Sequence, residues 1–263
     1  MLLLAKILVT LIMILLLTAI AEHLNPKIAG ILSGYPIGSA IVLYFYGLEY
    51  GVAFASVSAL YNLAGLVPSL MFALVYLFVL RRKPDCSVAV VVVLALSGYL
   101  VGAVTIGLLH LSPPAAIALA VAALLVSSFL VRGRHEQARA PKLPFQLRVV
   151  LFRVVCAATL VITITALAGH VDSSWAGIFS AFPLILMPLV VIVHLHFGAA
   201  CARSLLSHFP VGLWSVFCYA LTLAVACPRF GLHLGTLIGF GVATLVLLLL
   251  NARGLMASLR RTT

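Results

Sequence analysis

Charged residues are scarce in this sequence, and their scarcity excludes a soluble globular domain. Only 8% of the 263 residues are charged, whereas a soluble domain usually has about 25%. Hydrophobic residues make up 65% of the chain, and the mean hydropathy is +1.29. The long apolar runs do not alternate with polar residues, which excludes the strands of a membrane barrel. The composition therefore predicts an all-α, polytopic membrane protein.

About nine apolar runs approach the roughly 20 residues that a helix needs to cross the hydrocarbon core. These runs leave no stretch long enough for a soluble domain. We expect membrane spans at residues 1–22, 28–47, 52–80, 87–110, 113–132, 147–169, 174–195, 199–226 and 231–251.

Acidic residues are especially rare, with five in the chain. None falls in the middle of an expected span, whereas a cation exporter or a proton pump commonly keeps a carboxylate at mid-depth. This absence favours an anionic or neutral solute over a cation. Any proton coupling falls to histidine, whose unperturbed pKa of about 6.5 suits that role.

Motifs of catalysis and of cofactor binding are also missing. The sequence has no HExxH, Walker or GxSxG motif, and its five cysteines lack the CxxC spacing of zinc or redox sites. His194 and His196 stand two residues apart, which places them on different faces of a helix. We therefore predict no enzyme, no catalytic residue, no cofactor and no metal site.

What the sequence does contain is an internal repeat. Residues 18–36, TAIAEHLNPKIAGILSGYP, return 147 positions later as TALAGHVDSSWAGIFSAFP at residues 165–183, with nine identical positions. The same offset relates Gly51 to Gly198. This duplication predicts two related halves of four spans each. The expected domains are repeat one at residues 1–110, a connecting helix with a basic cytoplasmic linker at residues 111–146, and repeat two at residues 147–263.

The connecting helix decides how the halves are oriented. With one unpaired span between equivalent positions, the two repeats must cross the membrane in opposite directions. We therefore expect two inverted four-helix repeats joined by a ninth helix. The first span also has features of a signal peptide, with Lys6 before an apolar core and small residues at Ala19 and Ala21. We expect it to be retained, because cleavage would divide the repeat.

Basic residues are distributed unevenly over this predicted topology. With the N-terminus outside, fourteen of the sixteen lysines and arginines fall on the inner side, and only Lys6 and Arg229 fall outside. Basic residues collect in cytoplasmic loops, so we predict an outer N-terminus and a cytoplasmic C-terminus. The same rule explains the net charge of +11 without a nucleic-acid partner.

The repeated element resembles a known family. AGILSGYP followed by Gly51 and Gly65, and AGIFSAFP followed by Gly198 and Pro210-Val-Gly-Leu-Trp-Ser215, look like the GlpM family of small bacterial inner-membrane proteins. The second half matches better, because the first has Gly65-Leu-Val-Pro68 in place of Gly-Leu-Trp-Ser. The resemblance implies a fused pair of GlpM-like four-span units in a bacterial inner membrane, and it implies no chemistry.

Each repeat places a proline inside the helix that the motif begins. Pro36 and Pro183 remove the hydrogen bonds to the carbonyls four residues back. We expect the Leu32 and Phe179 carbonyls to be left free, or to be met by water, a serine or a ligand. Interruptions at corresponding positions of two inverted halves point to a transporter's binding site. A tightly packed pair of kinked helices is the alternative.

Polar and aromatic residues around these prolines form the predicted site. For substrate binding, we predict Ser33, Tyr35, Pro36, Asn62, Ser180, Phe182, Pro183 and His208. For gating or proton coupling, we predict His23, His170, Asp172 and Glu22. The alternative for the histidines is an interfacial side chain bonded to the backbone, and for Asp172 it is a helix N-cap.

These features favour a transporter that moves a small or lipid-linked solute, anionic or neutral, by alternating access. The alternative is a non-transporting membrane subunit or scaffold that assists an envelope biosynthesis pathway. The expected partners are the lipid bilayer and the solute, and a homodimer is compatible with either function.

Overall fold

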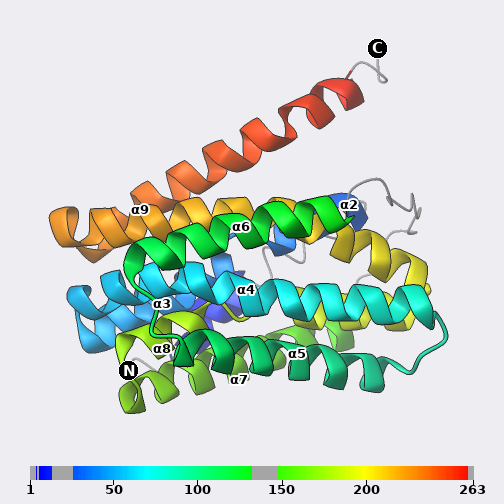
Figure 1. Cartoon of the computed structure of the whole chain (residues 1–263), viewed down its shortest axis with the longest axis horizontal. Helices are drawn as coiled ribbons and strands as arrows, with labels where there is room; N and C mark the ends of the chain where they lie inside the picture. Colours follow the sequence, from blue (N-terminus) through cyan, green and yellow to red (C-terminus); the bar gives the residue numbers. More distant parts are fainter. Residues whose placement is uncertain (1–3, 5, 14–25, 132–146, 260–263) are drawn as a thin grey trace.

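The computed structural model describes residues 4, 6–13, 26–131 and 147–259 (Figure 1). These residues form helices without a strand, so the expected all-α class is confirmed. Residues 6–13 are helical. The other helices are α2 (Pro26–Ser33), α3 (Ile37–Tyr50), α4 (Val52–Arg82), α5 (Val88–Leu108), α6 (Pro113–Val131), α7 (Leu147–Leu167), the short 3-10 helix η1 (Ala168–His170), α8 (Ser173–Ser180) and α9 (Leu186–Leu259).

Six stretches of the described residues are long and apolar enough to cross a membrane, where about nine were expected. One difference is that the expected span 1–22 falls mostly outside the described residues. The other is that the last three expected spans, 174–195, 199–226 and 231–251, share the single stretch of α9, whose backbone is non-helical only at Gly198 and Gly231. The six stretches are Ile28–Tyr50, Val52–Arg82, Val88–Leu108, Pro113–Val131, Leu151–His170 and Leu186–Leu250.

The breaks between helices recur at the repeat offset. α2 and α8 are each eight residues long, and their first residues, Pro26 and Ser173, lie 147 positions apart. Gly51 separates α3 from α4 with a φ of +89°, and Gly198 bends α9 with a φ of +76°. A positive φ is readily adopted only by glycine. The repeated glycines therefore explain why the chain turns at both places.

Each short helix packs against a long helix from the other half of the sequence. α2 lies on α9, and α8 lies on α4. A Cβ added to Gly30 would meet the Leu205 carbonyl oxygen, and a Cβ added to Gly177 would meet the Ser58 carbonyl oxygen. The repeat offset relates these two contacts to each other. Small residues let membrane helices approach closely, so the repeated glycine explains both crossings.

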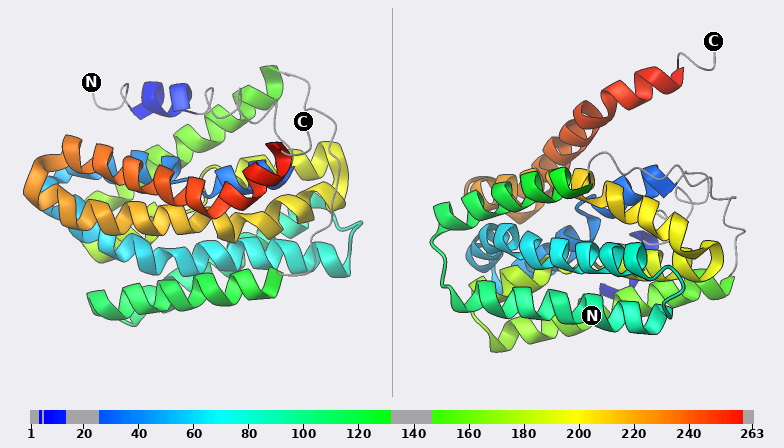
Figure 2. Two further views of the ribbon diagram at one scale, coloured as in Figure 1. Left: turned by 90° about the horizontal axis from the view of Figure 1, so that it is seen from above. Right: turned by 45° about the vertical axis from the view of Figure 1, so that its right-hand side comes forward.

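The helix ends gather at two ends of the molecule. α4 lies between α5 and α6 (Figure 1). The α4–α5 connection lies at the same end as α2, whereas α8 and the α5–α6 connection lie at the other end (Figure 1). Beyond Gly231, α9 turns back and runs away from the body at an angle (Figure 2). It still contacts the body at Thr244, whose hydroxyl lies 2.7 Å from that of Tyr35, and it exposes Leu237 and Leu249. α5, α6 and α7 also expose large apolar side chains, as contact with lipid requires.

Candidate functional site

Both repeated prolines lie in breaks between helices. Pro36 stands between the end of α2 and the start of α3, and Pro183 stands between the end of α8 and the start of α9. A proline cannot donate the hydrogen bond that would continue a helix. Each expected kinked helix is therefore two helices joined by a turn.

The carbonyls that the prolines leave without helical partners are bonded within these turns. The Tyr35 amide donates to the Leu32 carbonyl, and the Phe182 amide donates to the Phe179 carbonyl, each at 3.0 Å. The expectation that these carbonyls are free, or are met by water, a serine or a ligand, is therefore wrong. The physical reason is that the chain leaves the helix at this point, so a nearby backbone amide can turn back to each carbonyl.

A pocket lies where the two breaks meet. Its inner volume is about 20 Å³, and with its open mouth the unfilled space is about 310 Å³. The inner volume has room for about one water molecule. Four predicted substrate-binding residues line the pocket, two from each break: Ser33, Tyr35, Phe182 and Pro183.

Asn62 and Ser69 are the repeat mates of two lining residues, Phe209 and Val216, and they make hydrogen bonds across the crossing. Asn62 Nδ2 donates to Ser180 Oγ at 2.7 Å, and the Ser69 hydroxyl donates to the Ala181 carbonyl. Asn62 is fully buried, and its Oδ1 has no hydrogen-bond partner within the described chain. Its repeat mate Phe209 lines the pocket. The two halves therefore differ at the crossing, because the Asn62–Ser180 bond has no counterpart between Phe209 and Ser33, although other repeat mates such as Tyr35 and Phe182 both line the pocket.

The other predicted residues do not line this pocket. Pro36 is buried beside it, and His208 is buried on α9, where its Cβ would lie 3.2 Å from a Cβ added to Gly30. His170 is exposed in η1. The structure thus brings together the four predicted residues that line the pocket, and it leaves Pro36, His208 and His170 outside the lining. The predicted gating residues Glu22 and His23 lie outside the described residues.

Asp172 is the N-cap of α8, which confirms the alternative given for this residue; its predicted gating role stays a prediction. Asp172 Oδ1 accepts hydrogen bonds from the Ser174 amide at 3.1 Å and the Trp175 amide at 3.0 Å. The Ser174 hydroxyl donates to the same oxygen at 2.8 Å. These donors, led by the Trp175 amide, hold the pKa of the Asp172 carboxyl below its ordinary value of 3.8, because they favour the charged form.

Replacing Asp172 by alanine is expected to cost about 1 kcal/mol of stability at neutral pH, because two α8 amides lose their acceptor. The folded-state pKa is lowered, so the charge-dependent part of the stabilisation is present above the ordinary pKa. That part is lost as the pH falls through the lowered folded-state value. Thermal unfolding of the purified protein at pH 7 and pH 3 measures both effects. Asp172→Asn keeps an acceptor but has no charge. Its unfolding midpoint at pH 7 should therefore lie between those of wild type and D172A. A D172A midpoint equal to wild type at pH 7 would contradict the cap.

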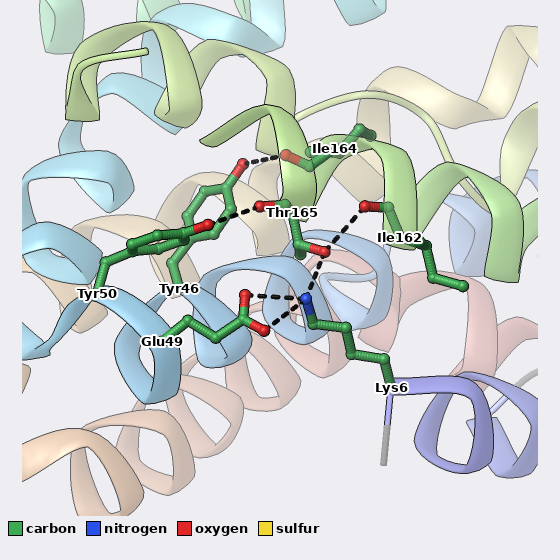
Figure 3. Close-up of polar contacts among 7 residues, drawn as sticks. All are labelled: Lys6, Tyr46, Glu49, Tyr50, Ile162, Ile164 and Thr165. Atoms are coloured by element: carbon green, nitrogen blue, oxygen red, sulfur yellow. Dashed lines mark hydrogen bonds and ion pairs between the residues drawn. The ribbon is translucent and has the colours of Figure 1, made fainter. Parts of the chain in front are cut away.

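A buried ion pair lies on the side of α3 that faces α7 (Figure 3). Lys6 Nζ lies 2.7 Å from Glu49 Oε1 and donates to Thr165 Oγ1 at 2.8 Å. The Tyr50 hydroxyl donates to the Thr165 carbonyl at 3.1 Å, and the Tyr46 hydroxyl donates to the Ile164 carbonyl at 3.5 Å. The cluster therefore joins the helix of residues 6–13 to α3 and α7.

Sequence reasoning missed this cluster. It placed Lys6 on the outer side and left Glu49 between the expected spans 28–47 and 52–80, without connecting the two. The structure buries the Lys6 side chain and encloses most of the Glu49 side chain, at 8% and 18% exposure. The available signal was that each is a lone charge beside an apolar run, and a buried charge needs a partner of opposite sign.

The histidine pair on α9 has two separate sets of partners. His194 Nδ1 lies 3.0 Å from the Tyr76 hydroxyl, and His196 Nδ1 lies 3.1 Å from the Ile192 carbonyl. The described residues contain no group of three or more histidine, cysteine or carboxylate side chains that could hold a metal ion. These two histidines therefore act as single polar side chains of α9.

Comparisons with known proteins found no relative of this chain. No family model, no curated protein and no solved structure matches the chain. The function must therefore be argued from the two breaks, the pocket between them and the buried ion pair.

Proposed function

We propose that this chain is a membrane transporter built from two inverted four-helix repeats and a connecting helix, with nine crossings. It moves a small or lipid-linked solute, anionic or neutral, by alternating access where the two breaks cross. The observation that carries the proposal is the pair of breaks, which share the repeat offset and line one pocket. Interrupted helices at corresponding positions of inverted halves are typical of transporter sites.

The positions of the short helices support inverted repeats. α2 lies at the end of the molecule where α4 meets α5, whereas its repeat mate α8 lies at the other end (Figure 1). The bends at Gly198 and Gly231 divide α9 into three lengths, which correspond in the repeat to α3, α4 and α5. Because α6 has no counterpart, it supplies the odd crossing between the halves.

Basic residues support the orientation in the membrane. Arg203 Nη1 donates to the Leu80 carbonyl at 3.1 Å, which brings Arg203 beside Arg81 and Arg82 at the end of α4. Cytoplasmic ends of membrane helices are enriched in such residues. This end is therefore cytoplasmic in the proposal, which places the N-terminus outside. The GlpM-like motifs add the expectation of a bacterial inner membrane.

The asymmetry of the crossing supports alternating access. In an inverted pair, exchanging the conformations of the two halves opens the closed side and closes the open one. A buried, unpaired carbonyl oxygen costs about 1–3 kcal/mol, and Asn62 Oδ1 is such an atom. That cost destabilises the described conformation and favours a second one, in which this oxygen gains a donor from water or solute.

Accessibility from the two membrane faces tests this proposal without knowledge of the solute. Single cysteines replace Ser33, which lines the pocket, and its repeat mate Ser180, which accepts a hydrogen bond from Asn62, after the five native cysteines are changed to serine. In oriented vesicles, an impermeant thiol reagent should label the two positions from opposite faces. Ser97→Cys, on the exposed face of α5, is the control within the lipid. Labelling of both positions from one face only, or of neither, would exclude alternating access at this site.

One observation favours the second candidate, a non-transporting subunit or scaffold. The pocket is small, and the centre between the breaks is otherwise filled by buried side chains such as Leu66, Phe209 and Leu213. A scaffold needs such a filled centre and no second conformation. It predicts that neither cysteine is labelled from either face.

A further inference from the structure

The start of α3 holds two backbone amides without acceptors. α3 begins at the pocket, and Pro36 at its N-cap position makes no side-chain cap. The Ala40 amide donates to the Pro36 carbonyl at 2.7 Å, but the Gly38 and Ser39 amides have no acceptor among the described residues. Amides at a helix N-terminus are normally satisfied by a cap, by water or by a ligand. Gly38 and Ser39 line the pocket, so these two donors stand at its wall.

The Ser39 side chain is an independent observation that points to a ligand. It is 7% exposed and lines the pocket, and within the described chain its hydroxyl makes no hydrogen bond. Serines elsewhere in these helices, such as Ser97 and Ser207, donate to the carbonyl four residues back. The repeat mate of Ser39 is Leu186. The hydroxyl is therefore a feature of one half alone, although both halves line the pocket.

The charge around these donors sets the class of ligand. The N-terminus of a helix carries a partial positive charge, and α3 is 14 residues long. α9 also begins beside the pocket, where Leu184 and Ile185 line the wall. No acidic or basic side chain is among the lining residues that the structure describes. Helix ends without a cationic side chain suit a single negative charge better than a multiply charged group.

The pocket also has an apolar wall. Leu66, Phe182, Leu213 and Val216 line the pocket together with Ser33 and Tyr35. Such a wall excludes water from the donors and strengthens their interaction with an anion, because the local dielectric constant is low. It also provides a surface for the apolar part of the same molecule. The lining therefore matches a solute with one charged end and one apolar end.

We propose that the Ser39 hydroxyl, together with the Gly38 and Ser39 amides, binds the oxyanion of a singly charged amphipathic solute. The oxyanion is a carboxylate or a phosphodiester, and the apolar part of the solute packs on the leucine and valine wall. This inference rests on the proposed function, because it takes the pocket as the site of the transported solute. Binding of the whole solute requires the wider space at the mouth of the pocket, since the inner volume admits about one oxygen-sized group.

Equilibrium binding to the purified full chain in detergent tests the site. The probes are radiolabelled octanoate, a carboxylate, and dibutyl phosphate, a phosphodiester, with octanamide as the uncharged control. We expect saturable binding of at least one anion, about tenfold or more tighter than octanamide, because hydrogen bonds to a charged group are the stronger ones. The anion that binds distinguishes a carboxylate solute from a phosphodiester solute.

Variants at Ser39 connect this binding to the proposed donors. Ser39→Ala should weaken anion binding about tenfold, and Ser39→Leu, which copies the repeat mate, should abolish it. Ser97→Ala, on the exposed face of α5, should bind like wild type. Monodisperse elution of each variant checks its folding, and Ser39→Cys, close to serine in size but a weak donor, tests the same loss if the alanine variant fails that check.

Three results would overturn the site: no saturable binding of either anion, equal affinity for octanamide, or unchanged binding by the Ser39 variants. The binding experiment can fail independently of the labelling experiment that tests transport. Anion binding that depends on Ser39, without labelling from opposite membrane faces, keeps the site and rejects transport. Labelling from opposite faces, without binding that depends on Ser39, keeps transport and rejects this site.

Discussion

Replacing Lys6 by methionine is expected to lower the free energy of unfolding by about 3 kcal/mol. Lys6 Nζ lies 2.7 Å from Glu49 Oε1, and the two side chains are 8% and 18% exposed. Removing the cation leaves the Glu49 carboxylate half-enclosed without its partner, and an uncompensated buried charge costs more than the pair contributes. Because Glu49 keeps some exposure, the expected loss lies at the lower end of the range for buried pairs.

Two further variants separate this effect from a general loss of charge. Lys6→Met combined with Glu49→Met should recover most of the loss, because apolar replacements of both partners are often neutral. Lys83→Met removes an exposed lysine after α4 and should change stability by less than about 0.5 kcal/mol. The measurement is equilibrium unfolding in detergent micelles. A single Lys6 variant as stable as the Lys83 variant would contradict a buried pair, and so would a double variant as unstable as the single one.

Adding one methyl group at Gly212 is expected to destabilise the protein by about 3 kcal/mol, the upper end of the cost of overpacking. A Cβ at this position would meet the Ile31 carbonyl oxygen and would lie 2.9 Å from Gly34 Cα. Both neighbours are backbone atoms, so they cannot rotate away as a side chain would. The substitution therefore forces α2 and α9 apart at the crossing beside the pocket.

Gly65 is the repeat mate of Gly212, and Gly241 provides a control. A Cβ on Gly65, the repeat mate, would lie 2.6 Å from the Ile178 carbonyl oxygen and 2.7 Å from Ala181 Cβ. Gly65→Ala should therefore destabilise by a similar amount. Gly241→Ala should stabilise by about 0.5–1 kcal/mol, because that helical glycine has no atom within 4 Å of the added Cβ. Thermal unfolding of the three variants tests the close crossings. Equal midpoints for Gly212→Ala and Gly241→Ala would show that the helices do not meet there.

The local breaks were readable from the sequence, because proline and glycine act on the backbone near them. Pro36 and Pro183 marked the two interruptions, and Asp172 marked the start of α8. The sequence did not predict that backbone amides of the turns donate hydrogen bonds to the Leu32 and Phe179 carbonyls. This bonding depends on how the chain turns after leaving the helix, and a proline determines only that the helix cannot continue.

The pocket was only partly predictable for a related reason. The repeat pointed to Ser33 and Phe182, which line it, because symmetry-related breaks tend to meet. Asn62 was predicted because it is a polar residue at membrane depth, and its side chain instead bonds to Ser180. Ser39 was not singled out, because a serine in an apolar helix usually bonds to its own backbone. Only the three-dimensional packing shows that its hydroxyl has no such bond.

The sequence by itself determined that this protein is helical and membrane-like, and that its breaks recur at a fixed offset. Those properties depend on apolar composition and on backbone preferences within a few residues. The tertiary structure alone decided which distant residues meet. Lys6 reaches Glu49 across 43 positions and Thr165 across 159, and α2 packs on a helix from the other half. Such contacts follow from the mutual packing of whole helices, which no local pattern records.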